Sequence, residues 1–123
     1  MSQEPETTLI TALIVLPLFY NPDKLRHRRP VEQQKIVETC EEVALRFGGA
    51  TFDDRPRRGF WPSRGIIYED EVGILEVDIT GTEQDKAWLL DYAEKVLLKR
   101  FEQEAIYIKF VGPFEVHVVE ARG

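Results

Sequence analysis

Apolar and polar residues follow strand-like and helical patterns in turn along this chain. The run Leu9–Tyr20 is almost continuously apolar, which is typical of a central strand covered on both faces or of one whose second face a partner buries. Pro17 has no N–H to donate, so we expect a bulge or the end of a pairing there. The run is too short to span a bilayer, and the residues before it carry no Lys or Arg, unlike a secretory signal.

Two stretches repeat apolar residues at helical spacing. The first carries Ile36, Cys40, Val43, Ala44 and Phe47, and the second carries Trp88, Leu89, Ala93, Val96, Leu97 and Phe101. Pro30 is predicted as the first residue of the first helix, and Gly48-Gly49 as its end. Thr82 with Asp85 three residues later resembles a capping box for the second helix.

Shorter alternating segments predict the remaining strands. Ala50–Phe52 opens a second strand, which runs into a predicted loop rich in Pro, Gly and Arg, Asp53–Gly65. A third strand is predicted from near Ile66 to about Ile79, with Gly73 as a bulge.

A fourth strand, Ala105–Val111, is interrupted at Gly112-Pro113, and Phe114–Val119 then alternates as a fifth strand or a bent continuation. The order β-α-β-β-α-β predicts an α+β, ferredoxin-like sandwich. Its antiparallel sheet has four or five strands in the spatial order 4-1-3-2, with two helices on one face. The 123 residues fit a single domain, with a loose N-terminus over 1–7 and a strand-like tail over 112–123.

Charge is distributed unevenly. The net charge of −6 disfavours a general nucleic-acid binder. Segments 21–30 and 53–65 nevertheless hold half of the 16 basic residues: Lys24, Arg26, Arg28, Arg29, Arg55, Arg57, Arg58 and Arg64. The predicted topology places both segments at one end of the sheet, so we expect a basic end on an acidic body.

This basic end is the candidate ligand site. Arginine forks suit phosphate or carboxylate, and aromatic rings stack on bases. The candidate ligand-binding residues are Arg26, His27, Arg28, Arg29, Arg57, Arg58, Trp61 and Arg64. The alternative is a solvated surface or a subunit contact, in which these arginines pair with nearby carboxylates such as Asp53, Asp54 and Glu69 at little energetic consequence.

No group of side chains predicts a reaction, a metal site or a cofactor. Cys40 is the single cysteine, so no disulfide forms within the chain, and a cytoplasmic location is expected. It falls on the apolar helix face as a small hydrophobe. His27 lacks the positioned partner that a general base needs. Glu115 with His117 supplies only two metal ligands.

Four segments together resemble small uncharacterised bacterial proteins with a ferredoxin-like fold. They are Phe47-Gly48-Gly49-Ala50-Thr51, Gly59-Phe60-Trp61, Tyr68-Glu69-Asp70-Glu71 and Arg100-Phe101-Glu102-Gln103-Glu104-Ala105. The resemblance covers most of residues 9–111 and implies this fold and self-association, with no catalytic residue.

The favoured hypothesis is a non-enzymatic homodimeric interaction module, because the apolar first strand needs cover on both faces. A second is a sensor or binding module for an anionic small molecule or nucleotide at the Arg-rich end. A third is an RNA- or DNA-binding protein or nuclease, whose binding should weaken steeply with salt. An enzyme would need a cleft with a perturbed His27 or carboxylate. No membrane partner is expected.

Overall fold

The computed structural model describes residues 8–121, which form one sheet and one layer of helices. The elements are β1 (Leu9–Pro17), α1 (Gln33–Phe47), β2 (Thr51–Ser63), β3 (Ile66–Thr80), α2 (Glu83–Tyr92), η1 (Ala93–Leu97), α3 (Leu98–Arg100) and β4 (Ile108–Phe114). The segments α2, η1 and α3 follow one another without a gap, with η1 as a π-helical turn. None of the helices in this part of the chain is long and apolar enough to cross a membrane.

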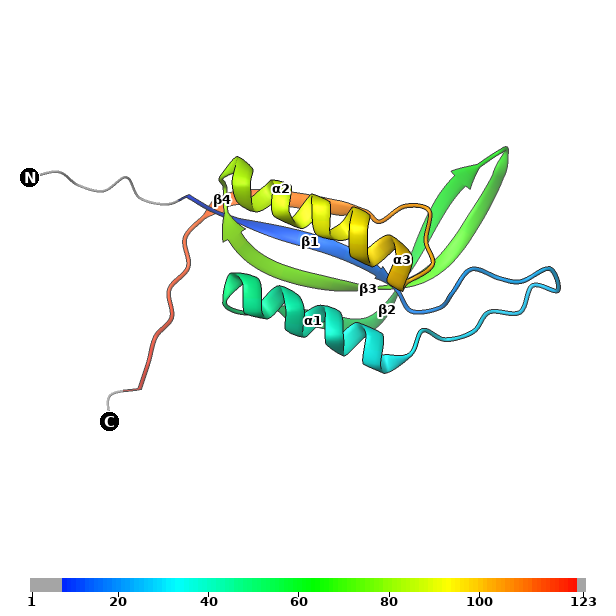
Figure 1. Ribbon diagram of the computed structural model, residues 1–123, viewed down its shortest axis with the longest axis horizontal. Coiled ribbons are helices and arrows are strands. Elements are labelled where there is room, and N and C mark those ends of the chain that lie inside the picture. Colours follow the sequence, from blue (N-terminus) through cyan, green and yellow to red (C-terminus); the bar gives the residue numbers. More distant parts are fainter. Residues whose placement is uncertain (1–7, 122–123) are drawn as a thin grey trace, which may run out of the picture.

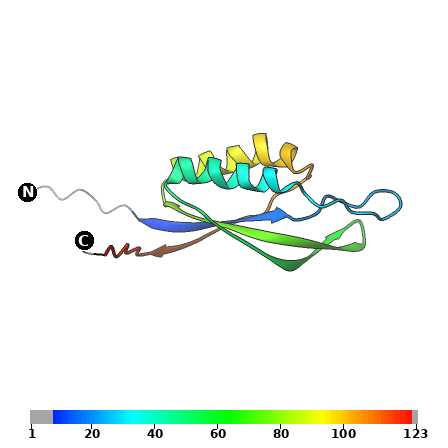
Figure 2. The same ribbon diagram turned by 90° about the horizontal axis from the view of Figure 1, so that it is seen from below.

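The four strands form an antiparallel sheet in the order β2-β3-β1-β4, which is 4-1-3-2 when read from the other edge. Both helical segments lie on one face of this sheet, and the opposite face is left open (Figures 1 and 2). The predicted α+β class and four-stranded antiparallel sheet are therefore confirmed. The arrangement is compatible with a ferredoxin-like fold.

The hydrophobic core lies between the sheet and the helices. Alternate residues of β1, from Ile10 to Leu16, are buried on the helix side, as are Leu75, Val77 and Ile79 of β3. Between them, Leu9, Thr11, Leu13 and Val15 point to the open face and are partly exposed. The continuous apolar run thus has one face covered by the helices and a second face that the helices leave uncovered.

The predicted end of the first helix is confirmed, and its predicted start is not. Gly48 is left-handed (φ 92°) and its N–H donates to the Ala44 carbonyl at 2.7 Å, so the predicted helix end is confirmed. The predicted start at Pro30 is wrong. Pro30 pairs with Phe19 in a short bridge, flanked by the hydrogen bond from Val31 N–H to the Leu18 carbonyl. The chain stays extended up to Glu32, which occupies the N-cap position of the helix without a side-chain cap hydrogen bond.

The cap of α2 agrees with the prediction. The Thr82 hydroxyl accepts a hydrogen bond from the Asp85 N–H at 3.2 Å. The Asp85 carboxylate in turn accepts from the Thr80 hydroxyl at 2.6 Å, which ties the helix start to the end of β3.

The predicted loop Asp53–Gly65 is wrong, because this segment is most of strand β2. Its turn consists of Arg64 (φ 51°) and Gly65 (φ 79°), two left-handed residues that suit a tight hairpin. Among the strands of residues 8–121, β2 is an edge strand that pairs with β3 alone, so Pro62 is tolerated within it.

The bulge also lies elsewhere than predicted. Gly73 pairs regularly with Leu16, and the register shift falls on the β2 side, between Asp53 and Arg57. Gly73 leaves the space that the Phe52 ring occupies, since a Cβ there would lie 2.5 Å from that ring. Pro56 lies inside the shifted segment, where a missing N–H disrupts no ladder pair.

β4 begins and ends three residues later than the predicted strand Ala105–Val111, and within residues 8–121 the predicted fifth strand does not form. β4 continues through Gly112-Pro113, and Phe114 pairs with Leu9 after a register shift. Up to residue 121 the chain after Phe114 forms no strand and is exposed, because no neighbouring strand lies beside it. The predicted loose N-terminus, residues 1–7, and residues 122–123 lie outside the described residues.

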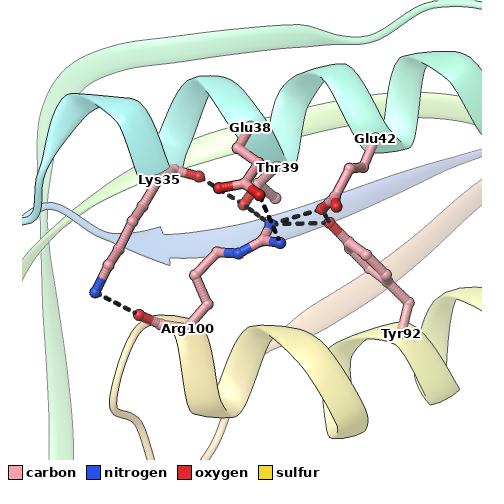
Figure 3. A network of polar contacts seen from close by, with 6 residues as sticks. All are labelled: Lys35, Glu38, Thr39, Glu42, Tyr92 and Arg100. Carbon is pink, nitrogen blue, oxygen red and sulfur yellow. Dashed lines mark hydrogen bonds and ion pairs between the residues drawn. The ribbon is translucent and has the colours of Figure 1, made fainter.

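A polar cluster joins the two helical segments on the outer side (Figure 3). This Arg100 cluster comprises Lys35, Glu38, Thr39, Glu42, Tyr92 and Arg100. Nη1 of Arg100 donates to Glu42 Oε1 at 2.7 Å and to Thr39 Oγ1 at 2.9 Å, and Tyr92 OH donates to the same Glu42 oxygen at 2.6 Å. Because these groups satisfy one another, the cluster is a structural contact between α1 and α2–α3.

Candidate functional site

The β2–β3 hairpin curls across the open face of the sheet. Trp61 of β2 meets Tyr107, which stands just before β4, with ring centroids 6.3 Å apart and ring planes inclined at 41°. β2 and β4 are the two opposite edges of the sheet, so this contact spans its whole width. The curl makes the open face concave.

A cavity of about 390 Å³ lies beside these two rings. Its apolar lining includes Val15, Pro17, Val72 and Ile106. Its polar lining consists of Asn21, Asp70, Gln103 and Glu104. Within residues 8–121, no Lys or Arg lines it. The size and the mixture of an apolar floor with a few polar groups are typical of a small-molecule site.

A second hollow, of about 450 Å³, continues along the open face and shares Val15 and Tyr107 with the first. It is lined by the apolar side chains of Leu13 and Ile74 and by groups of both charges: Asp53, Arg57, Glu76 and Lys109. The two hollows therefore form one groove whose ends differ in charge.

The structure brings the two basic segments to the same end of the molecule, as predicted. Loop 21–30 and the β2–β3 hairpin extend together beyond the helices (Figures 1 and 2). Arg28 lies near enough to Glu69 to help lower the pKa of that carboxyl, although Arg58, hydrogen bonded to Glu69, is the main cause. Glu69, Asp70 and Glu71 share this end, so it is less basic than the two segments alone suggest.

Most of the candidate ligand-binding arginines are engaged within the chain. Arg28 stacks over the Phe19 ring at 4.8 Å, and Arg29 stacks over Tyr20 at 4.4 Å and lies 3.8 Å from the Glu102 carboxylate. Such exposed contacts contribute little stability, but they divide the arginines among separate partners.

The arginines of β2 are likewise paired. Arg58 is hydrogen bonded to Glu69 across the hairpin, and Arg57 lies 3.6 Å from Asp53. Arg55, hydrogen bonded to Asp53, holds the pKa of that carboxyl well below its usual range. The predicted site is therefore a set of surface pairs at one end, and of its members only Trp61 and Arg57 line the groove.

The remaining candidates stay apart from the groove. Arg26 and His27 lie in the exposed loop, where the N–H of His27 donates to the Asp23 carboxylate at 2.8 Å. Arg64 forms the tip of the hairpin turn. Burial raises the pKa of the Cys40 thiol, which makes it a poor nucleophile. Residues 8–121 contain no group of three or more side chains suited to a metal ion.

Sequence reasoning missed Tyr107, Asp70 and Glu104. The available signal was the alternation within the predicted strand 105–111, where Tyr107, Lys109 and Val111 alternate with the core-facing Ile108 and Phe110. That alternation predicts a second face bearing an aromatic ring. It does not predict the curl of β2 that places Trp61 beside it.

Comparison with known proteins supplies the fold alone. No family model and no curated protein matches this sequence. Two solved structures of a phage SAM lyase are similar in fold: one in the apo state (TM-score 0.56, 14% identity) and one in complex with S-methyl-5′-thioadenosine (TM-score 0.58, 17% identity). Each alignment covers 89% of this chain and 85% of the other.

Proposed function

We propose that this protein binds a small molecule of the adenosyl nucleoside class in the cavity beside Trp61 and Tyr107. The observation that carries the proposal is the cavity itself, which combines two aromatic rings with an apolar floor and a few polar groups. The proposal takes the protein as a cytoplasmic, ferredoxin-like binding module. It assigns no reaction.

The lining chemistry favours a nucleoside over a nucleotide. A base stacks on exposed aromatic rings, and the amides of Asn21 and Gln103 can read its hydrogen-bonding edge. The carboxylates of Asp70 and Glu104 accept hydrogen bonds from ribose hydroxyls and attract a positive charge, but they repel a phosphate. This differs from the anionic ligand that the Arg-rich segments suggested.

The similar solved structure that contains S-methyl-5′-thioadenosine supports the choice of probe. That molecule is an uncharged adenosyl thioether, which suits an aromatic cavity lined by carboxylates. At 17% identity the two proteins are similar in fold alone. The proposal therefore depends on the side chains that line the cavity of this chain.

Isothermal titration calorimetry with S-methyl-5′-thioadenosine tests the proposal. Trp61→Ala should weaken binding by about 5- to 150-fold, since stacking on one base is worth about 1–3 kcal/mol. Phe60→Ala is the matched control: the neighbouring ring is also exposed, but it points to the other side of the hairpin. Absence of binding at millimolar concentrations, or equal weakening by both variants, would contradict the proposal.

A comparison of adenosine with AMP separates this proposal from the anionic-ligand alternative. We expect AMP to bind more weakly than adenosine, because Asp70 and Glu104 line the cavity. Tighter binding of AMP, lost in Arg28→Ala or Arg64→Ala, would instead favour a ligand site at the Arg-rich end. Salt-sensitive binding of a short RNA would favour the nucleic-acid hypothesis.

A further inference from the structure

The outer part of the β2–β3 hairpin, residues 57–70, projects beyond the helices as a two-stranded arm (Figure 1). Its tip carries large apolar side chains with high exposed fractions: Phe60 (56%), Ile66 (56%), Ile67 (65%) and Tyr68 (45%). An isolated two-stranded hairpin is marginally stable in water, and exposed apolar patches of this kind mark interaction sites. The arm is therefore a candidate docking element.

The pairing within the arm determines which side chains share a face. Trp61 pairs with Tyr68, and Ser63 pairs with Ile66. Directly paired residues of an antiparallel ladder point to the same side, so Ile66 and Tyr68 continue the open face that Trp61 belongs to. The tip thus presents an apolar surface on the concave side of the molecule.

The open face of the sheet has an apolar surface that could receive the apolar side chains of the arm tip. The second hollow on the open face, lined by Leu13, Val15 and Ile74, is large enough to receive one or two apolar side chains. These three residues remain partly exposed, because both helical segments lie on the opposite face of the sheet.

The arm tip and the second hollow also carry opposite charges. Arg64 stands at the tip of the arm, and Glu76 is exposed on the wall of the hollow. Within residues 8–121 neither side chain forms an ion pair. An arm tip seated in the hollow would bring a guanidinium to an unpaired carboxylate.

We propose that the arm tip of one chain docks in the second hollow of another copy, with Ile66 and Tyr68 against Leu13 and Ile74 and with Arg64 facing Glu76. Because one chain carries both the arm and the hollow, two copies related by a twofold axis form the contact twice. A homodimer is then the smallest closed assembly. This inference goes beyond the proposed nucleoside binding, since it concerns the association of two chains.

Sedimentation velocity of the full chain at tens of micromolar tests the docking. The unaltered chain should sediment as a dimer or a larger closed oligomer. Arg64→Glu should raise the dissociation constant by at least about tenfold, because a like charge then faces Glu76 across the contact. The double variant Arg64→Glu with Glu76→Arg should restore association, because the charges are complementary again.

Glu94→Arg is the matched control: it reverses an exposed charge on the helical side, away from the arm and the hollow, and should leave association unchanged. A monomeric unaltered chain, unchanged association of Arg64→Glu, or failure of the double variant to restore association would each overturn the proposal. Titration of the same variants with S-methyl-5′-thioadenosine reports on the nucleoside cavity separately, so the two proposals can fail independently.

Discussion

Trp61 and Tyr107 are in ring contact across the full width of the sheet, although they belong to its opposite edges. The contact requires the hairpin to curl over the open face, because β3 and β1 lie between the two edges. A bulge in β2 increases the local twist and bends the strand. Gly73 lies opposite the bulge, and the Phe52 ring fills the space that a side chain there would take. We infer that the missing side chain allows the strand to bend beside the cavity.

Substitution of Gly73 should therefore affect both stability and binding. In Gly73→Ala the new Cβ would lie 2.5 Å from Phe52 Cζ and 3.0 Å from the Asp53 carbonyl. We expect a loss of about 1–3 kcal/mol in the free energy of unfolding, measured by urea denaturation, and weaker nucleoside binding. Gly81→Ala is the control, since its nearest contact is an ordinary 3.5 Å, and should change stability by about 0.5 kcal/mol or less. Equal stability of the two variants would refute the steric role of Gly73.

Arg100 should stabilise the packing of the two helical segments. Its side chain is only 14% exposed, and Arg100→Met keeps the aliphatic stem but removes the hydrogen bonds to Thr39 and Glu42. We expect a loss of about 2–3 kcal/mol in the free energy of unfolding, because a partly buried carboxylate loses its partner. Lys99→Met, at the exposed neighbouring position, should change it by about 0.5 kcal/mol or less. A similar small change in both variants would show that the cluster contributes nothing.

The same cluster should make stability depend on acid pH. The guanidinium of Arg100, hydrogen bonded to Glu42, holds the pKa of that carboxyl below its ordinary value of 4.5. A carboxyl with a lowered folded-state pKa contributes stability above the unfolded value, and this contribution disappears as pH falls through the folded value.

Glu42→Gln isolates this contribution from that of other carboxylates. The difference in the free energy of unfolding between the unaltered chain and Glu42→Gln should be largest near neutral pH and should shrink as the pH falls below about 4.5. Urea denaturation over a pH series measures it. A difference that is constant across the series would show that ionisation of Glu42 does not stabilise the fold.

The sequence by itself determined the elements of the core. The apolar periodicity of the two helices, the Gly48 end and the Thr82 cap are local signals, because each depends on residues a few positions apart. The order of strands and helices then limits the sheet to very few arrangements, and the apolar first strand requires a central place. For the same reason the two basic segments were correctly placed at one end.

Only the tertiary structure decided the course of residues 53–65 and the site beside Trp61. The prolines and glycines of this segment predict a loop from the local sequence. The segment is nevertheless a strand, because its backbone is hydrogen bonded to β3, and this pairing depends on residues distant in the sequence. Likewise, the arginine-rich segments predict one anion-binding site from the sequence. In the structure these arginines instead pair with Asp53 and Glu69 or stack on aromatic rings. The meeting of Trp61 with Tyr107 depends on the curl of the whole sheet, which is a property of pairing and twist and not of either segment alone.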